Sequence, residues 1–349
     1  MDRAQTRGES RLGEEADVKP ANFRAVQRQL ADALDQENRA DSGMHPTLEA
    51  QRALVGEPPR LAKAAVLEGV DVQRRPVQGS PEVGFSAFLD GIQASRVLLY
   101  DSAVPIVHGS VGAAIRIRED RRLTTWSFEK ESRAYAPLGF LSTRAKASLN
   151  AVHVDVVDTT PRRSNGEVDD EARHPLTLAD VAVHAVQAHR EALEHRLAES
   201  WVAGERRLLY VDGGISGSAR MVDAPNAIGV VKSHRILYGD PAAVRTILSL
   251  AEGERSSVFT IESPDRRRSA VASWYLRIRD AAGRDPLWGM VRIEISPPST
   301  AQIDAVGARA DQVSRWVLAE VAPLSLPDSR WDTMVYGIRD CEQFLRSVQ

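Results

Sequence analysis

Acidic residues close two apolar segments of this 349-residue chain that have the pattern of buried strands. Asp90 follows the run FSAFL, and Asp212 follows the run LLYV. Carboxylate oxygens are the ligands that Mg²⁺ and Mn²⁺ prefer. Two such ions about 4 Å apart can activate a water molecule and neutralise charge on a departing oxygen, which is what phosphodiester cleavage requires. Each Asp is followed by Gly, so a tight turn is the alternative interpretation of both positions.

A long helix predicted between these segments supplies a third acid. Its apolar residues recur at helical spacing and form one stripe: Val186, Leu193, Leu197 and Trp201. At about 100° per residue, Glu194 lies roughly 55° from the centre of this stripe and Glu191 roughly 115° away. We therefore expect Glu194 to flank the buried face and Glu191 to face water, and we favour Glu194 as the ligand.

Two further positions are candidates for the same site. The last predicted helix, 339–348, carries Asp340 and Glu342, and we take Asp340 as a metal ligand. Stabilisation of a helix N-terminus by negative charge is the alternative for these acids. Lys232 follows a predicted strand and could stabilise charge, or could simply extend to solvent. We expect His234 to be an ordinary surface residue.

Arginines at alternate positions of predicted strands are candidates for binding a phosphate backbone, because alternate residues share one face. These nucleic-acid-binding candidates are Arg116, Arg118, Arg277 and Arg279. Trp274 and Tyr275 could stack on bases, but we favour packing in the core for this pair.

The composition is that of an ordinary globular protein, with 43% hydrophobic and 27% charged residues and a net charge of −3. Any nucleic-acid-binding surface must therefore be local. The single cysteine excludes an internal disulfide and a cysteine-based zinc site, which fits a cytoplasmic protein. We expect no membrane association, because the most apolar stretch, 97–115, is interrupted by polar residues and proline.

The elements that would position these residues suggest an α/β fold. We expect residues 1–20 to be disordered and residues 21–75 to form a helical N-terminal extension. Residues 80–349 would form the main domain, with an insertion at about 120–175. The order in this domain is three strands, a helix, a further strand and then mixed elements. This order predicts a mixed β-sheet flanked by helices, as in the RNase H-like fold.

Two stretches resemble the NurA nucleases, a family with an RNase H-like fold. They are FLDGIQASRVLLY around Asp90, and LLYVDGG at 208–214 followed by IGVVKSH at 228–234. The resemblance covers about residues 80–345. It implies that Asp90, Glu194 and Asp212 bind metal and that Lys232 contacts phosphate or water. The residue that follows each Asp-Gly pair differs from the family pattern. The chain also lacks the C-terminal histidine of the family, and Asp340 could take the role of that histidine.

The resemblance also implies an activity and partners. The chain would be a Mn²⁺- or Mg²⁺-dependent nuclease that cleaves DNA ends or single strands. It would act as a homodimer with a HerA-type hexameric ATPase, in DNA repair and end resection or in phage defence. A catalytically inactive RNase H-like scaffold that binds DNA or the ATPase is the alternative. We rank a guide-dependent, Argonaute-like nuclease last, because the chain is short for additional guide-binding domains.

Overall fold

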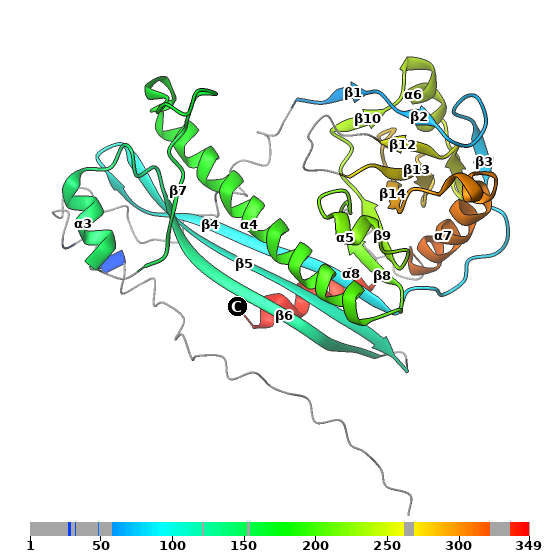
Figure 1. Cartoon of the computed structure of the whole chain (residues 1–349), viewed down its shortest axis with the longest axis horizontal. Helices are drawn as coiled ribbons and strands as arrows, with labels where there is room; N and C mark the ends of the chain where they lie inside the picture. Colours follow the sequence, from blue (N-terminus) through cyan, green and yellow to red (C-terminus); the bar gives the residue numbers. More distant parts are fainter. Residues whose placement is uncertain are drawn as a thin grey trace, which may run out of the picture.

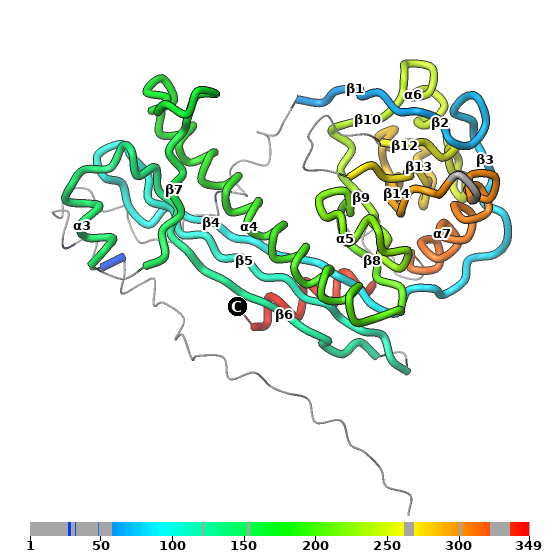
Figure 2. The backbone as a smooth tube through the Cα atoms, in the orientation of Figure 1, coloured from blue at the N-terminus to red at the C-terminus, as the bar shows by residue number. Residues whose placement is uncertain are grey.

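A computed structural model gives the fold of the chain (Figures 1 and 2). It describes residues 58–120, 122–151, 154–261, 269–321 and 336–348, together with positions 27, 28, 32 and 48. Its centre is one large mixed sheet, with helices on both faces (Figure 1).

Three long antiparallel strands form one side of this sheet. They are β4 (Ala87–Asp101), β5 (Val104–Glu119) and β6 (Arg122–Ala136). Strand β4 continues without a break through Asp90 and Gly91, which pair with Ala114 and Ala113 of β5. The apolar runs of the sequence predict two strands here, 83–90 and 96–100, whereas the structure has a single strand.

A long helix, α4 (Pro175–Gly204), carries the chain across the sheet. His174 caps its first turn by accepting from the amide of Leu176, and Pro175 occupies the first helical position, where its missing N–H costs nothing. Strand β8 (Leu209–Asp212) then pairs in parallel with β4. The short helix α5 (Ala219–Val222) leads to β9 (Ala227–Val231), which is parallel to β8.

The resulting strand order is β6–β5–β4–β8–β9. Three strands, a helix and a further strand follow in the expected order, but two of the three strands that we expected are one strand, β4, and the third strand of the sheet is β6. The predicted α/β class, a mixed sheet flanked by helices, is confirmed.

The sheet continues beyond β9 through antiparallel strands. These are β14 (Met290–Ile295), β13 (Val271–Arg277) and β12 (Phe259–Ile261), with β2 (Ala65–Val66) at the end, while β11 (Glu254–Ser256) and β3 (Arg74–Pro76) branch from β13. A separate pair joins β1 (Arg60–Ala62) to β10 (Ile236–Tyr238). The helices of this part are α6 (Pro241–Leu248), the 3₁₀ helix η3 (Thr300–Ala305) and α7 (Val306–Val321).

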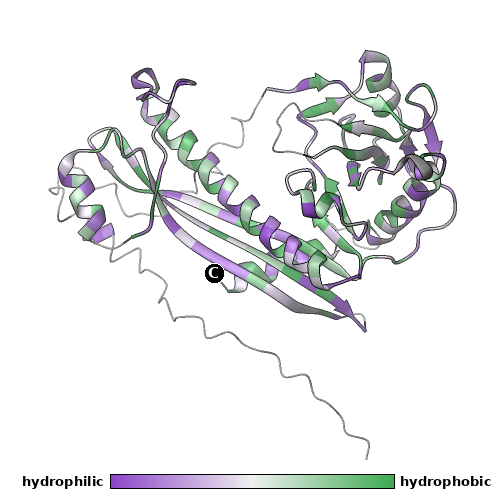
Figure 3. Cartoon of the chain, viewed as in Figure 1, coloured by the Kyte–Doolittle hydropathy of each residue, from purple (hydrophilic) through white to green (hydrophobic). Residues whose placement is uncertain are grey.

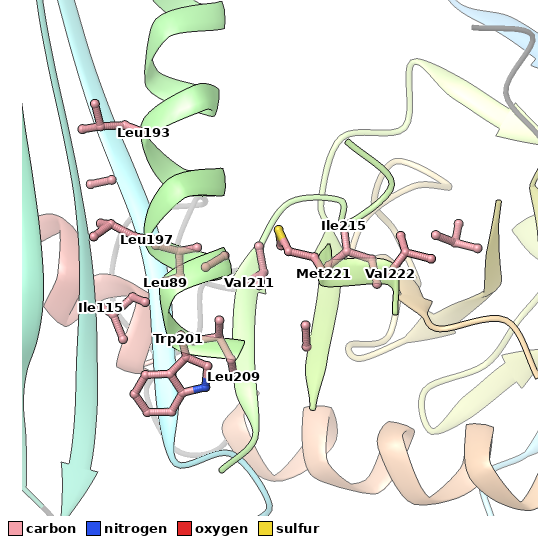
Figure 4. Close-up of a cluster of buried hydrophobic side chains, with 14 of the residues drawn as sticks. Leu89, Ile115, Leu193, Leu197, Trp201, Leu209, Val211, Ile215, Met221 and Val222 are labelled. Carbon is pink, nitrogen blue, oxygen red and sulfur yellow. The ribbon is translucent and has the colours of Figure 1, made fainter. Parts of the chain in front are cut away.

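Two apolar cores lie on opposite faces of the sheet. Leu89 and Val211 belong to the core on the α4 side, where Leu193, Leu197 and Trp201 cover them (Figure 4). Their strand neighbours Phe88 and Tyr210 belong to the other core, which is covered by α7 and by α8 (Tyr336–Ser347). Helix α4 carries both hydrophobic and hydrophilic residues, as a helix lying on a sheet must (Figure 3).

Two of the predicted boundaries are wrong. Strand β6, which we assigned to an insertion at about 120–175, is the third strand of the central sheet. The intervening segment is 137–174, with α3 (Thr143–Ala151), β7 (Val156–Asp158) and η2 (Asp170–Ala172). Residues 60–76 contain short strands rather than the end of a helical extension: β1 pairs with β10 apart from the large sheet, and β2 and β3 pair with β12 and β11 of the large sheet. Most of the extension, and the segment 1–20, lie outside the described residues.

Candidate metal centre

Asp90 is a buried acid in the interior of a strand. Its side chain is 5% exposed, and Oδ1 accepts a hydrogen bond of 2.8 Å from the amide of Gly91. Oδ2 is buried and has no hydrogen-bond partner among the described residues. The turn interpretation of Asp90-Gly91 is therefore wrong. A buried carboxylate oxygen without a donor carries a large desolvation cost that a bound cation would offset.

Asp212 lies beside Asp90 at the end of β8. The last pair between the two parallel strands is Leu89 with Val211, so Asp90 and Asp212 occupy the next register position on strands about 4.8 Å apart. The chain leaves β8 through Gly213, whose φ of 138° is a conformation that favours glycine. It continues to α5 rather than into a hairpin, so the turn interpretation also fails here.

Glu194 approaches the same place from α4. Its side chain is buried, whereas the side chain of Glu191 is 43% exposed and accepts a hydrogen bond from Gln187. A Cβ atom at position 91 would overlap Oε1 of Glu194, so only glycine leaves room for this carboxylate against β4. The position of Gly91 explains the Asp-Gly pair: glycine here serves close packing, not a turn.

Asp90 and Glu194 lie on opposite faces of β4, at the neighbouring positions 90 and 91. Leu89 packs toward α4, so Asp90 points to the other face, toward α8. Glu194 stays on the α4 face above Gly91. In the described part of the chain β8 stops at Asp212, so no strand separates the two faces beyond this point.

The electrostatics show that the three carboxyl groups interact. Burial raises the pKa of Asp90 well above its usual value, and the charges of Asp212 and Glu194 raise it further, while Lys232 opposes the shift. Burial likewise raises the pKa of Glu194 to about 7, against the opposing effect of Arg190 and with a smaller contribution from Asp212. A divalent cation between these groups would remove their repulsion.

Two basic side chains already engage the site. Lys232 Nζ lies 2.8 Å from Oδ2 of Asp212, so this lysine is an ion-pair partner rather than a solvent-directed side chain. Arg190, one turn before Glu194 on α4, forms an ion pair with Oε1 of that residue. Sequence reasoning missed Arg190, although its i,i+4 spacing from Glu194 was a usable signal.

The C-terminal helix carries two acids near the site, Asp340 and Glu342. The charge of Glu342 raises the pKa of Asp90. Asp340 forms an ion pair of 2.5 Å with Arg116. The assignment of Asp340 as a metal ligand stays a prediction, and Glu342, two positions later on α8, is a second candidate.

The four arginines that we expected to bind DNA have other partners. Arg116 pairs with Asp340, and Arg118 pairs with Glu320 at 2.6 Å. Arg277 is fully buried and donates to backbone carbonyl groups, so the prediction that it contacts DNA is wrong. Arg279 donates to the carbonyl of Val321 at 2.7 Å.

The neighbouring aromatic and imidazole groups are structural. Trp274 and Tyr275 are fully buried in the core, as we favoured. His234 is not an ordinary surface residue: its Nε2 lies 2.8 Å from the carbonyl oxygen of Met290, and burial lowers its pKa.

A buried acid that sequence reasoning missed holds the loop after Asp212. Glu294 of β14 accepts a hydrogen bond of 2.8 Å from the amide of Ile215 and pairs with Arg292 at 2.6 Å. A Cβ atom at Gly214 would lie 2.8 Å from Oε2 of Glu294. Glu294 therefore fixes the course of the chain directly after Asp212.

The carboxylate oxygens of these residues are suitable ligands for a divalent cation. Asp90 Oδ2 is the oxygen that lacks a partner, and the other carboxylates are held by Lys232 and Arg190. No three His, Cys, Asp or Glu side chains of the described ranges are gathered tightly enough to hold an ion. Metal binding by these carboxylates would therefore require them to move closer together.

The helices of the described ranges are all too short or too polar to cross a lipid bilayer.

Comparison with known proteins gives weak likenesses. No protein-family model matches the sequence, and a search of curated proteins gives no significant match. Among solved structures, the chain is similar to the NurA nuclease from Sulfolobus solfataricus, at 12% identity and a TM-score of 0.37, over 94% of each chain. It is also similar to the catalytic domain of human Endonuclease V, at 13% identity and a TM-score of 0.29, over 93% of this chain and 96% of that one. Scores this low support no argument about activity, so the strand order and the site carry the functional argument.

Proposed function

We propose that this protein is a divalent-metal-dependent nuclease that hydrolyses phosphodiester bonds of DNA at Asp90, Glu194 and Asp212. The observation that carries the proposal is Asp90, a strand-interior carboxylate with a buried oxygen that lacks a donor. Such an oxygen is costly for the fold, and a bound cation would offset that cost. Hard oxygen ligands favour Mg²⁺ or Mn²⁺.

Each residue has a definable task in this proposal. Asp90 and Asp212 would hold metal from adjacent strand positions, and Glu194 would hold it from α4. Glu342 would add negative charge from α8. Metal ions bound here would supply an activated water and a Lewis acid for the departing oxygen. Lys232, at the same edge, would stabilise negative charge that develops on the phosphate.

The proposed ligands come from two strands and two helices, in the region where β8 ends and β4 continues to Asp101. The substrate that we propose is a DNA end or single strand, an expectation that comes from the resemblance of the Asp-Gly segments to the NurA nucleases. The same resemblance leads us to propose a homodimer and a HerA-type hexameric ATPase as its partner, in end resection or phage defence.

One observation favours a second candidate, an inactive scaffold that binds DNA or the ATPase. Lys232 and Arg190 neutralise Asp212 and Glu194 without any metal. In a scaffold these ion pairs would be permanent and would serve only stability. Such a protein would bind DNA without cleaving it.

A cleavage assay separates the two candidates. The purified full chain is incubated with single-stranded DNA and with linear duplex DNA, in Mn²⁺, in Mg²⁺ or in EDTA. We expect cleavage that depends on the metal and is lost in Asp212→Asn. Binding without cleavage in either metal, alone and with a HerA-type ATPase, would support the scaffold.

A further inference from the structure

Arg190 occupies the position in which a cation would contact Glu194. Its guanidinium forms an ion pair with Oε1 of Glu194, the oxygen that lies over Gly91. Both side chains are largely buried, at 21% and 10% exposure. The pair is therefore shielded from water and is stronger than an exposed pair on a helix surface.

The sheet holds Arg190 in this place. Its Nε donates a hydrogen bond of 3.0 Å to Oε1 of Gln93 on β4. Gln93 is two residues after Gly91, so the two positions lie on the same face of the strand. Arg190 is thus held by Glu194 of its own helix and by Gln93 of the strand beneath it, and its guanidinium also lies 3.7 Å from Oε1 of Glu191.

The charges explain why a cation is needed there. Asp90, Glu194 and Asp212 contribute three carboxyl groups near the end of β8, and Lys232 forms its ion pair with Asp212. Arg190 is the basic side chain that pairs with Glu194, and a buried carboxylate that loses such a partner raises the free energy of the folded state. Glu194 can accept a divalent ion on Oε1 only if Arg190 leaves that oxygen.

We propose that Arg190 is a built-in counter-ion that competes with the divalent cation for Glu194. The inference rests on the proposed metal centre and adds a residue that controls its affinity. Arg190 stabilises the protein before metal binds, and the ion must displace its guanidinium from Oε1. The site therefore binds metal more weakly than the same carboxylates would alone.

Metal binding by the full chain tests this competition without any measurement of cleavage. Calorimetry with MnCl₂ at pH 8.5 is compared for the wild type, Arg190→Gln and Arg190→Lys. We expect Arg190→Gln to bind Mn²⁺ about tenfold more tightly, whereas Arg190→Lys stays within about twofold of the wild type because it keeps the charge.

The control is Arg196→Gln, six residues further along α4. It removes one arginine charge from the same helix, but Arg196 pairs with Glu129 and Glu131 of β6. We expect no change in Mn²⁺ affinity for this variant. Equal tightening in both variants would overturn the proposal, because the gain would then reflect net charge alone.

The direction in which Arg190→Gln changes the Mn²⁺ affinity shows whether Arg190 competes with the metal or helps to bind it. If Arg190 instead orients Glu194 for the metal, Arg190→Gln will bind Mn²⁺ more weakly than the wild type, and the proposal is wrong. The variant Asp90→Asn shows whether the proposed metal centre itself is wrong. If the wild type binds Mn²⁺ and Asp90→Asn does not, the metal centre is supported. If Arg190→Gln then binds Mn²⁺ no more tightly than the wild type, only the competition by Arg190 is wrong. Absence of Mn²⁺ binding in all variants would overturn both.

Discussion

The buried carboxyl group of Glu194 makes the stability of the metal-free protein depend on pH. Burial raises its pKa from the usual 4.5 to about 7. Between these two values the folded protein holds a proton that the unfolded chain has lost. The stability that this proton contributes is greatest below pH of about 4.5, declines as the pH rises toward 7, and is absent above it.

The structure gives the size of this effect. Between pH 8 and pH 6 the folded protein takes up most of one proton at Glu194, which adds about 1 kcal/mol to the free energy of unfolding. For a chain of 349 residues, this corresponds to a rise in Tm of about 2 °C. Other groups also titrate in this range, so the quantity to compare is the difference between variants.

Thermal unfolding in EDTA at pH 6 and pH 8 measures that difference. The wild type should gain about 2 °C more than Glu194→Gln on going from pH 8 to pH 6. Glu191→Gln is the matched control: this neighbouring acid is 43% exposed and is a minor cause of the raised pKa of Glu194, so the variant should keep most of the wild-type gain. Equal pH dependence in the wild type and Glu194→Gln would refute the assignment of a raised pKa to this carboxyl group.

Three further variants test separate parts of the account. Lys232→Ala should lower cleavage roughly a hundredfold but DNA binding only slightly, if Lys232 stabilises developing charge; parallel losses in a binding titration would contradict this. Arg277→Ala should cost about 3 to 5 kcal/mol in urea unfolding, because it leaves buried carbonyl groups unpaired; a stable variant with weaker DNA binding would contradict its structural role. Gly91→Ala should weaken Mn²⁺ binding in calorimetry, since the added methyl group takes the space of the Glu194 carboxylate; unchanged affinity would show that this space is not needed.

The sequence predicted β5, α4, β8 and β9 in their order, but it divided β4 into two strands and assigned β6 to an insertion. Alternating apolar and polar residues and short apolar runs indicate strands. Apolar residues that recur with a 3.6-residue period indicate α4, and they place Glu194 beside its buried face. The same information cannot show whether an Asp-Gly pair ends a strand. Turn chemistry favours a hairpin at Asp90, but the pairing with β5 and the contact of Glu194 with Gly91 keep the strand continuous.

The hydrogen-bond and ion-pair partners of long side chains could not be predicted from the residue pattern. Arg277 and Arg279 occupy alternate positions of β13 and the segment that follows it, a pattern that also suits a surface stripe. Burial of Arg277 arises because four backbone carbonyl groups converge around its guanidinium from distant segments. The choice between Asp340 and Glu342 depends on how α8 is rotated against the sheet, and a short helix with two acids does not fix that rotation.

The proposed metal centre depends on the carboxylate of Asp90, and the variant Asp90→Asn removes its charge. Asparagine keeps the size of the side chain and can still accept from the amide of Gly91. The variant should therefore fold, and its Tm in EDTA should equal or exceed that of the wild type, because one of the repelling carboxylates is gone. Mn²⁺ at a hundred times its Kd should raise the Tm of the wild type by about 4 °C and that of the variant far less. The account predicts that Asp90→Asn binds DNA but does not cleave it in Mn²⁺. Cleavage by the variant at the wild-type rate would contradict the account.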